Sequence, residues 1–215
     1  MPRAVASPQL AQIAGQLTAA GFELPAEQIA SLSGFLDLLT RWNRVYNLTG
    51  IRDVDELIER HLVESLALKA LLRGERIADV GSGAGLPGVP LAITEPGRAF
   101  TLIESRAKRV RFLRHVVGSL GLANITVAHS RAEHLLVDRP FDTVLARAVA
   151  PPARLLEICR HLTAPGSILL LLTATHLHDE FRDLAQDFVL RPVDSPLPRL
   201  RGSIVLLERL KTKGP

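Results

Sequence analysis

Short apolar runs alternate with amphipathic segments from Glu75 onward, and this alternation limits the fold more than any other feature of the 215 residues. Runs that are apolar along their whole length predict strands buried on both faces of a mostly parallel sheet. The last two runs have no long helix between them, so they predict an antiparallel hairpin. The sequence therefore predicts a doubly wound α/β sheet. We expect strands at 76–80, 99–104, 124–129, 141–146, 167–172, 188–193 and 203–208, and helices at 107–120 and 152–162.

The N-terminal part of the chain has the pattern of helices instead. Apolar side chains recur there at steps of three and four residues, as on one helix face, at Ile29, Leu32, Leu36 and Leu39. Asp53 is placed to cap a second helix that runs through Leu68. Because no linker-like stretch separates the two patterns, we expect a helical cap, residues 1–72, packed on a sheet domain, residues 73–215.

Charge and cysteine content exclude several kinds of protein. The formal net charge is +4 at pH 7, a mild excess of base that favours a polyanionic partner without identifying it. Cys159 is the only cysteine, so the chain forms neither an internal disulfide nor a multi-cysteine zinc site. The apolar runs are far shorter than a membrane span, and the first residues lack the apolar stretch of a secretory signal. We expect a cytoplasmic protein with no membrane segment.

A glycine-rich loop, Ala78-Asp79-Val80-Gly81-Ser82-Gly83-Ala84-Gly85-Leu86-Pro87-Gly88, follows the first predicted strand and leads into a helix. Glycines at such a point let the backbone turn tightly and approach a ligand. Two registers compete. Gly83-x-Gly85-x-x-Gly88 satisfies the dinucleotide pattern of NAD enzymes. Asp79-x-Gly81-x-Gly83-x-Gly85 instead resembles the first motif of S-adenosylmethionine-dependent methyltransferases.

The position of the strand distinguishes the two registers. The NAD pattern requires an apolar strand that runs straight into its first glycine, yet Gly83 follows Gly81 and Ser82. The methyltransferase register places Gly81 directly after the strand. Glu104 ends the next strand, where a carboxylate can accept hydrogen bonds from ribose hydroxyls in either cofactor. The loop therefore favours S-adenosylmethionine, with NAD as the alternative.

Longer stretches carry a more specific resemblance. They are RWNRVYNLTGIRD and ERHLVESLAL upstream, then ADVGSGAGLPGVPLAI, TLIES-x-AKRVRFLRHV, HSRAEHL and FDTVLARAVAPPARLL. In this order they resemble the bacterial 16S ribosomal RNA guanine-N(7) methyltransferase family, of the RsmG or GidB type. The resemblance implies a class I, Rossmann-like S-adenosylmethionine-dependent methyltransferase with a helical N-terminal extension. It also implies a monomer whose substrate is 16S ribosomal RNA or the small ribosomal subunit.

The same resemblance assigns roles to residues at the ends of the predicted strands. It implies that Arg147 lies at the mouth of the pocket beside the methyl donor, as the one catalytic candidate. The family usually has Lys-Gly at the end of the fifth strand, where this chain has Thr173-Ala174, so a candidate contact to phosphate or base is lost. The implied cofactor-binding residues are Asp79, Gly81, Gly83, Gly85, Leu86, Glu104, Ala132, Glu133 and Arg147.

The reaction that this family implies makes few chemical demands on the protein. Guanine N7 has a lone pair and no proton to lose, so we expect no general base and no metal ion, with catalysis by alignment and exclusion of water. A basic stretch on the helix 107–120 and just before it predicts phosphate contacts from Arg106, Lys108, Arg109, Arg111 and Arg114. A chain that binds the cofactor without transferring the methyl group, as an RNA-binding assembly factor, is the alternative function.

Four residues of the N-terminal part are candidates to approach the cofactor pocket: Arg41, Asn43, Asn47 and His61. For Asn43 and Asn47 a second interpretation is open, in which they hold turns in place. Trp42 and Tyr46 lie four residues apart, on one face of a helix, and we expect them to pack rather than to stack on bases.

Overall fold

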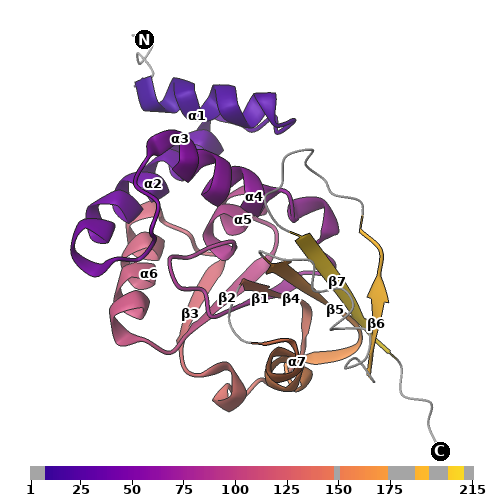
Figure 1. The fold of residues 1–215 in the computed structure, drawn as a ribbon. Helices are drawn as coiled ribbons and strands as arrows, with labels where there is room; N and C mark the ends of the chain where they lie inside the picture. Colours follow the sequence, from indigo (N-terminus) through magenta and orange to yellow (C-terminus); the bar gives the residue numbers. More distant parts are fainter. Residues whose placement is uncertain (1–7, 148–150, 174–186, 194–202, 211–215) are drawn as a thin grey trace, which may run out of the picture.

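The computed structural model describes residues 8–147, 151–173, 187–193 and 203–210. Its centre is a seven-stranded sheet with the order β3-β2-β1-β4-β5-β7-β6 (Figure 1). The strands β1 to β5 run parallel, β7 is antiparallel to β5, and β6 is antiparallel to β7. This confirms the predicted doubly wound sheet with its C-terminal hairpin. The strands span Arg76–Val80, Ala99–Glu104, Ile125–His129, Phe141–Arg147, Thr163–Thr173, Phe188–Arg191 and Ser203–Arg209.

Helices cover both faces of the sheet, because alternate residues of each strand point to opposite faces. In β1, Ile77 enters the core that it shares with α5 (Gly88–Thr94) and α6 (Ala107–Leu120). Its neighbour Ala78 enters the opposite core, with α7 (Pro152–Arg160). Both faces are therefore apolar, which is why the strands appear as unbroken apolar runs in the sequence.

The N-terminal helices lie on the same face of the sheet as α5 and α6 (Figure 1). Buried side chains of α1 (Pro8–Ala19) and α2 (Ala26–Tyr46) join one continuous core with Phe112 of α6 and Leu91 of α5. The separation of the chain into a cap and a sheet domain stays a prediction. Within the described residues, no helix has the length and apolarity to cross a membrane.

The second N-terminal helix begins as expected but is not a regular α-helix. The carboxylate of Asp53 accepts a hydrogen bond from the backbone of Glu56 at 3.0 Å and caps α3 (Val54–Leu57). The chain then widens into a π-helix, Ile58–Val63, before α4 (Glu64–Leu66) and the short helix Lys69–Leu71. Such wide turns are frequently found at functional sites.

Candidate functional site

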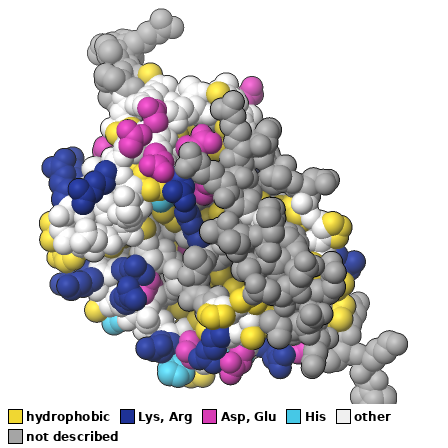
Figure 2. Space-filling model, viewed as in Figure 1, with side chains coloured by type: hydrophobic (Ala, Val, Ile, Leu, Met, Phe, Trp, Pro, Cys, Tyr) yellow, Lys and Arg dark blue, Asp and Glu magenta, His cyan; other side chains and the backbone are white. Residues whose placement is uncertain are grey.

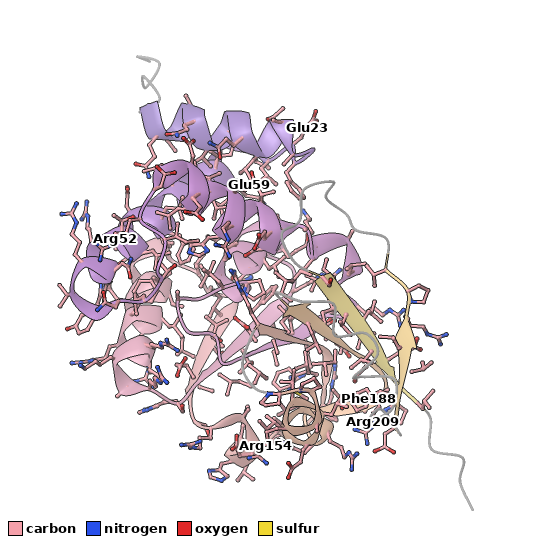
Figure 3. All side chains as sticks on the ribbon, in the orientation of Figure 1. Glu23, Arg52, Glu59, Arg154, Phe188 and Arg209 are labelled. Carbon is pink, nitrogen blue, oxygen red and sulfur yellow. The ribbon has the colours of Figure 1, made fainter. Side chains whose placement is uncertain are left out.

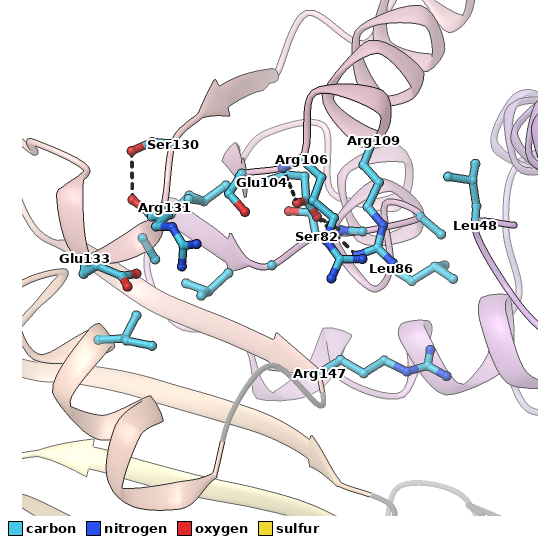
Figure 4. Close-up of a pocket in the computed structure, with 18 of the residues that line it drawn as sticks. Leu48, Ser82, Leu86, Glu104, Arg106, Arg109, Ser130, Arg131, Glu133 and Arg147 are labelled. Carbon is cyan, nitrogen blue, oxygen red and sulfur yellow. Dashed lines mark hydrogen bonds and ion pairs between the residues drawn. The ribbon is translucent and has the colours of Figure 1, made fainter. Parts of the chain in front are cut away.

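A cavity of about 780 Å³ lies at the carboxyl edge of the sheet, the edge where open α/β sheets bind ligands. Its walls come from the ends of β1, β2 and β4, the segment after β3, and the π-helix (Figure 4). Most of the predicted cofactor residues line it: Gly81, Gly83, Leu86, Glu104, Ala132, Glu133 and Arg147. Asp79 and Gly85 are not among the lining residues. They form hydrogen bonds within the loop and to the start of the next helix.

The glycine loop is closed against β2 by its own backbone. The N–H groups of Gly81 and Ser82 donate to the carbonyl of Ile103 at 2.9 and 3.2 Å. Gly81 and Gly85 both have positive φ, 67° and 83°, a conformation that residues with a Cβ rarely adopt. At Gly85 a Cβ would also lie 2.7 Å from a methyl group of Val89. The loop therefore requires glycine for its shape as well as for access to a ligand.

The carboxylate of Asp79 holds the loop to the helix that follows it. The side chain is 1% exposed, and its Oδ2 accepts a hydrogen bond from Gly88 N–H at 3.1 Å. Its Oδ1 is buried without a hydrogen-bond partner among the described residues. Burial is the main cause that raises the pKa of Asp79 to about 7. At neutral pH the folded protein therefore holds this group close to its point of half-protonation.

Replacing Asp79 by asparagine should change how stability depends on pH. A carboxyl whose pKa rises from 3.8 to about 7 on folding stabilises the native state below the lower value and loses that contribution as the pH rises through 7. We expect the free energy of unfolding of wild type to fall by about 4 kcal/mol relative to Asp79→Asn between pH 4 and pH 8. Urea denaturation of both proteins across this range measures the difference, and a constant difference would contradict the prediction.

Glu104 links the glycine loop after β1 to the loop after β2. It is 4% exposed, and its Oε2 accepts from Gly83 N–H at 3.0 Å while its Oε1 accepts from Arg106 N–H at 2.8 Å. Arg109 approaches the same carboxylate, with Nη1 at 3.7 Å from Oε2. Each carboxylate oxygen has two lone pairs, so both can accept a further hydrogen bond from a ligand.

Arg147 lies across the cavity from Glu104, at the end of β4 (Figure 4). Its guanidinium contacts the helical segment: Nη1 donates to the carbonyl of Arg60 at 3.4 Å, and Nη2 lies 3.8 Å from Glu64 Oε2. Burial is the main cause that lowers the pKa of Arg147, although the neighbouring Glu64 raises it. The side chain is thus a partly buried donor that bridges the sheet and the N-terminal helices.

His61 brings the π-helix into the cavity wall. Its ring is 3% exposed, and Nε2 lies 2.9 Å from the hydroxyl of Thr49. Nδ1 is buried and has no partner in the described part of the chain. Burial first, and then the charge of Arg147, lower the pKa of His61 to about 4. The ring is therefore neutral at physiological pH.

The far end of the cavity is built by Ala132 and Glu133, in the short helix Ala132–His134 (Figure 4). Arg154 of α7 lies 2.9 Å from Glu133 and also lines the cavity. Neither Arg154 nor Ile158, its neighbour on α7, was expected from the sequence. Both come from an amphipathic helix whose pattern predicts burial against the sheet and gives no sign of a pocket.

The predicted RNA-binding residues divide into two groups. Arg106 and Arg109 line the cavity. Lys108 lies over the ring of Tyr46, 6.0 Å from its centre, and Arg111 and Arg114 are exposed on α6. Tyr46 and Trp42 contact each other with tilted rings, 5.1 Å between ring centres, and pack against the core.

The residues with open interpretations also divide. His61 approaches the pocket, whereas Asn43 and Asn47 hold the turn after α2. The side chain of Asn43 accepts from Thr49 N–H at 2.9 Å, and Asn47 ends α2 in a left-handed conformation. Arg41 is exposed and does not line the cavity.

Two further expectations concern residues near the end of the sheet and a metal ion. Thr173 is the last residue of β5, and Ala174 lies outside the described residues. Among the residues that the structure describes, no group of His, Cys, Asp and Glu side chains is arranged to hold a metal ion.

Strand order, glycine loop and carboxylate together define a Rossmann-like, class I S-adenosylmethionine-dependent methyltransferase fold. A solved magnesium protoporphyrin IX methyltransferase from Synechocystis PCC 6803 with bound S-adenosylmethionine is similar, with a TM-score of 0.60, 16% identity, and coverage of 96% of this chain and 100% of that one. A methyltransferase from Geobacter sulfurreducens gives a TM-score of 0.55, 16% identity, and coverage of 94% and 96%. Both likenesses concern the fold.

The family follows from closer relatives. A family model described as rRNA small subunit methyltransferase G matches residues 28–196. Ribosomal RNA small subunit methyltransferase G from Yersinia pseudotuberculosis serotype O:3 (strain YPIII) is 44% identical over 188 residues, 86% of this chain and 91% of the relative. The protein of that name from Yersinia pestis (strain Pestoides F) gives the same values. The chain belongs to the rRNA small subunit methyltransferase G family, and its cofactor is S-adenosylmethionine, not NAD.

The cavity fits that cofactor in size and chemistry. Its volume of about 780 Å³ lies within the range of about 300–1,000 Å³ of small-molecule sites. Ile103, Ala132 and Ile158 supply apolar wall, and Glu104 supplies a carboxylate with lone pairs to spare. Such a wall suits an aromatic base, and such a carboxylate suits ribose hydroxyls.

Proposed function

We propose that this S-adenosylmethionine-dependent methyltransferase transfers its methyl group to the seven-nitrogen of one guanine in 16S ribosomal RNA. Family membership supports the enzyme class, the cofactor and the RNA. The observation that carries the proposed site is the convergence of the glycine loop, Glu104 and Arg147 on one cavity. We further infer a monomer that acts in the cytoplasm, where ribosomal subunits are made, and that needs no metal ion.

S-adenosylmethionine, when bound, supplies a methyl group activated by a positively charged sulfur. The role of the protein is to bind and orient the two reactants and to exclude water from the site. Glu104 accepts hydrogen bonds from the ribose, the backbone of Ala132 and Glu133 meets the adenine, and the loop from Gly81 to Leu86 encloses the remainder. Asp79 acts on this loop from behind, through Gly88.

Arg147 is the residue that we place beside the acceptor guanine. Methylation at N7 puts positive charge on the guanine, so a cation should not face the ring. A hydrogen bond from the guanidinium to the base carbonyl or to a phosphate orients the nucleotide and keeps the cation away from the ring that becomes positively charged. The neutral His61 ring and the carboxylate of Glu64 lie on the same side of the cavity as Arg147, and they add no further cation.

The basic residues at the mouth of the cavity supply the RNA contacts in this proposal. Arg106 and Arg109 lie at its rim, and the other members of the predicted set extend from it along α6: Lys108, Arg111 and Arg114. Phosphate contacts fix the register of an RNA and make binding depend on salt.

Methyl transfer to small-subunit RNA is the test. The purified chain is incubated with labelled S-adenosylmethionine and with naked 16S ribosomal RNA or assembled small subunits, and the modified nucleoside is mapped by mass spectrometry. We expect 7-methylguanosine at a single position. A chain that binds the cofactor yet transfers no methyl group to either substrate would be an assembly factor, and the proposal would be wrong.

The Arg147→Ala variant tests the role of that residue in the same assay. We expect the turnover rate to fall by about tenfold, the equivalent of one lost charge-assisted hydrogen bond, with the S-adenosylmethionine affinity changed by less than about threefold. Arg139→Ala, an exposed arginine at the opposite edge of the sheet, is the matched control and should behave as wild type.

A further inference from the structure

A second cavity lies in the N-terminal helices, directly beside the first. Its volume is about 390 Å³, which falls within the range of small-molecule sites. It is formed by the C-terminal half of α2 and by the segment from Thr49 to Leu57. Leu39, Ile51 and Leu57 give it apolar walls. Thr49 lines both cavities, so this space and the proposed active site share a wall.

The wall between the two cavities is held by hydrogen bonds. The hydroxyl of Thr49 accepts from Ile51 N–H at 3.2 Å and bonds to Nε2 of His61 at 2.9 Å. The backbone N–H of Thr49 donates to the side chain of Asn43 at 2.9 Å. Asn43 therefore lines the second cavity with its amide fixed in orientation. His61, on the other side of Thr49, lines the first cavity.

Two arginines border the second cavity, Arg44 and Arg52. Both are exposed, and neither forms an ion pair with a carboxylate in the described part of the chain. Arg60 on the same helical segment, by contrast, lies 3.4 Å from Glu56. Arg52 lies at the outer edge of the N-terminal helices (Figure 3), and Lys and Arg side chains gather on this side of the molecule while Asp and Glu gather above it (Figure 2).

Unpaired guanidinium groups above a cavity with partly apolar walls match one chemical class well. A nucleotide of single-stranded RNA presents a flat apolar base for the cavity and a phosphate for the arginines. Resting on the proposed function, we infer that this cavity binds an RNA nucleotide that neighbours the target guanine. The base lies against Ile51, and Arg44 and Arg52 contact phosphate. Recognition of the RNA thus extends from α6 onto the N-terminal helices.

The double variant Arg44→Ala/Arg52→Ala tests this inference with naked 16S ribosomal RNA and with assembled subunits. We expect the KM for RNA to rise by about tenfold or more, and the slope of log KM against log salt to decrease by about one for each lost phosphate contact. The S-adenosylmethionine affinity, measured by calorimetry, should not change. Arg139→Ala/Arg160→Ala removes the same charge from exposed positions elsewhere and should leave the salt slope unchanged.

A second variant tests the cavity rather than the charge. Ile51→Phe fills the apolar space, and it should raise the KM for RNA while both arginines remain; its thermal midpoint is measured to establish that it is folded. If wild type methylates the RNA and both variants keep its KM within twofold, the inference is wrong although the proposed function stands. A loss confined to assembled subunits, with naked RNA bound normally, would assign this surface to a ribosomal protein and overturn the inference. If wild type methylates neither substrate, the proposed function fails first.

Discussion

Replacing Glu104 by alanine should lower the affinity for S-adenosylmethionine by about 100-fold or more. The change removes the acceptor that we place on the ribose and leaves the N–H groups of Gly83 and Arg106 without their partner. Hydrogen bonds to a charged group contribute about 1.5–3 kcal/mol each. The loss of two hydrogen bonds between the carboxylate and the ribose hydroxyls is therefore enough for this effect. Titration calorimetry of the purified variant measures it directly.

Two companion variants show whether the effect belongs to the carboxylate. Glu104→Gln keeps one acceptor oxygen and should bind the cofactor with an affinity between those of wild type and Glu104→Ala. Glu27→Ala removes an exposed acid from the first turn of α2 and should bind as wild type does. If Glu104→Ala is folded and binds S-adenosylmethionine within about threefold of wild type, Glu104 has no part in the cofactor site.

The Gly85→Ala variant should lose about 2–4 kcal/mol of unfolding free energy. The left-handed backbone at this position, φ 83°, disfavours any residue with a Cβ. The added methyl group would also lie 2.7 Å from Val89 and 3.2 Å from Leu113, inside a packed core where overfilling costs about 1–3 kcal/mol. Urea denaturation in the absence of cofactor measures the loss.

The matched control, Gly118→Ala, should change stability in the opposite direction. Gly118 lies within α6, and no atom lies within 4 Å of the position of its Cβ. An alanine there should add about 0.5–1 kcal/mol, because glycine loses more conformational freedom in a helix. A Gly85→Ala protein as stable as wild type would mean that the loop can adopt another conformation without loss.

The sheet was predictable because its chemistry is local. Strands buried on both faces require continuous apolar runs, so the predicted ends differ from the observed ones by only one residue at β3, β4 and β7 and by two at β6. β5 is the exception: it begins at Thr163, four residues earlier than expected. The register there shifts between Phe141 and Thr143, and no apolar pattern marks the additional residues.

The part of the candidate site that lies on the sheet agrees with the strand pattern. Gly81 follows a strand, Glu104 and Arg147 each end one, and strand ends in a parallel sheet meet at one edge. The role of Arg147 comes from the family resemblance. Leu48 and Thr49 were missed because they reach the cavity through the packing of a distant segment. The π-helix has no signature in the spacing of apolar residues, since it is distinguished only by which carbonyl each N–H contacts.

The basic character of the second cavity could not be predicted from the net charge of the N-terminal part. The N-terminal part of the sequence has more acids than bases, which predicts that it is not the basic part of the molecule. The fold places Arg44 and Arg52 together at the second cavity, and no Asp or Glu is among the described residues that line it, so the local charge differs from the average. The net charge of a segment therefore gives no information on where its positive and negative side chains lie in the folded protein.

The wide turns of Ile58–Val63 determine which changes this segment can accept. A turn closed over five residues contains one residue more than an α-helical turn, and each residue rotates a helix by about 100°. Substitution at the exposed Glu59 leaves this count intact, whereas deletion of Leu62 or Val63 would rotate His61 by about 100° relative to Glu64. The length of this stretch is therefore under tighter constraint than its composition.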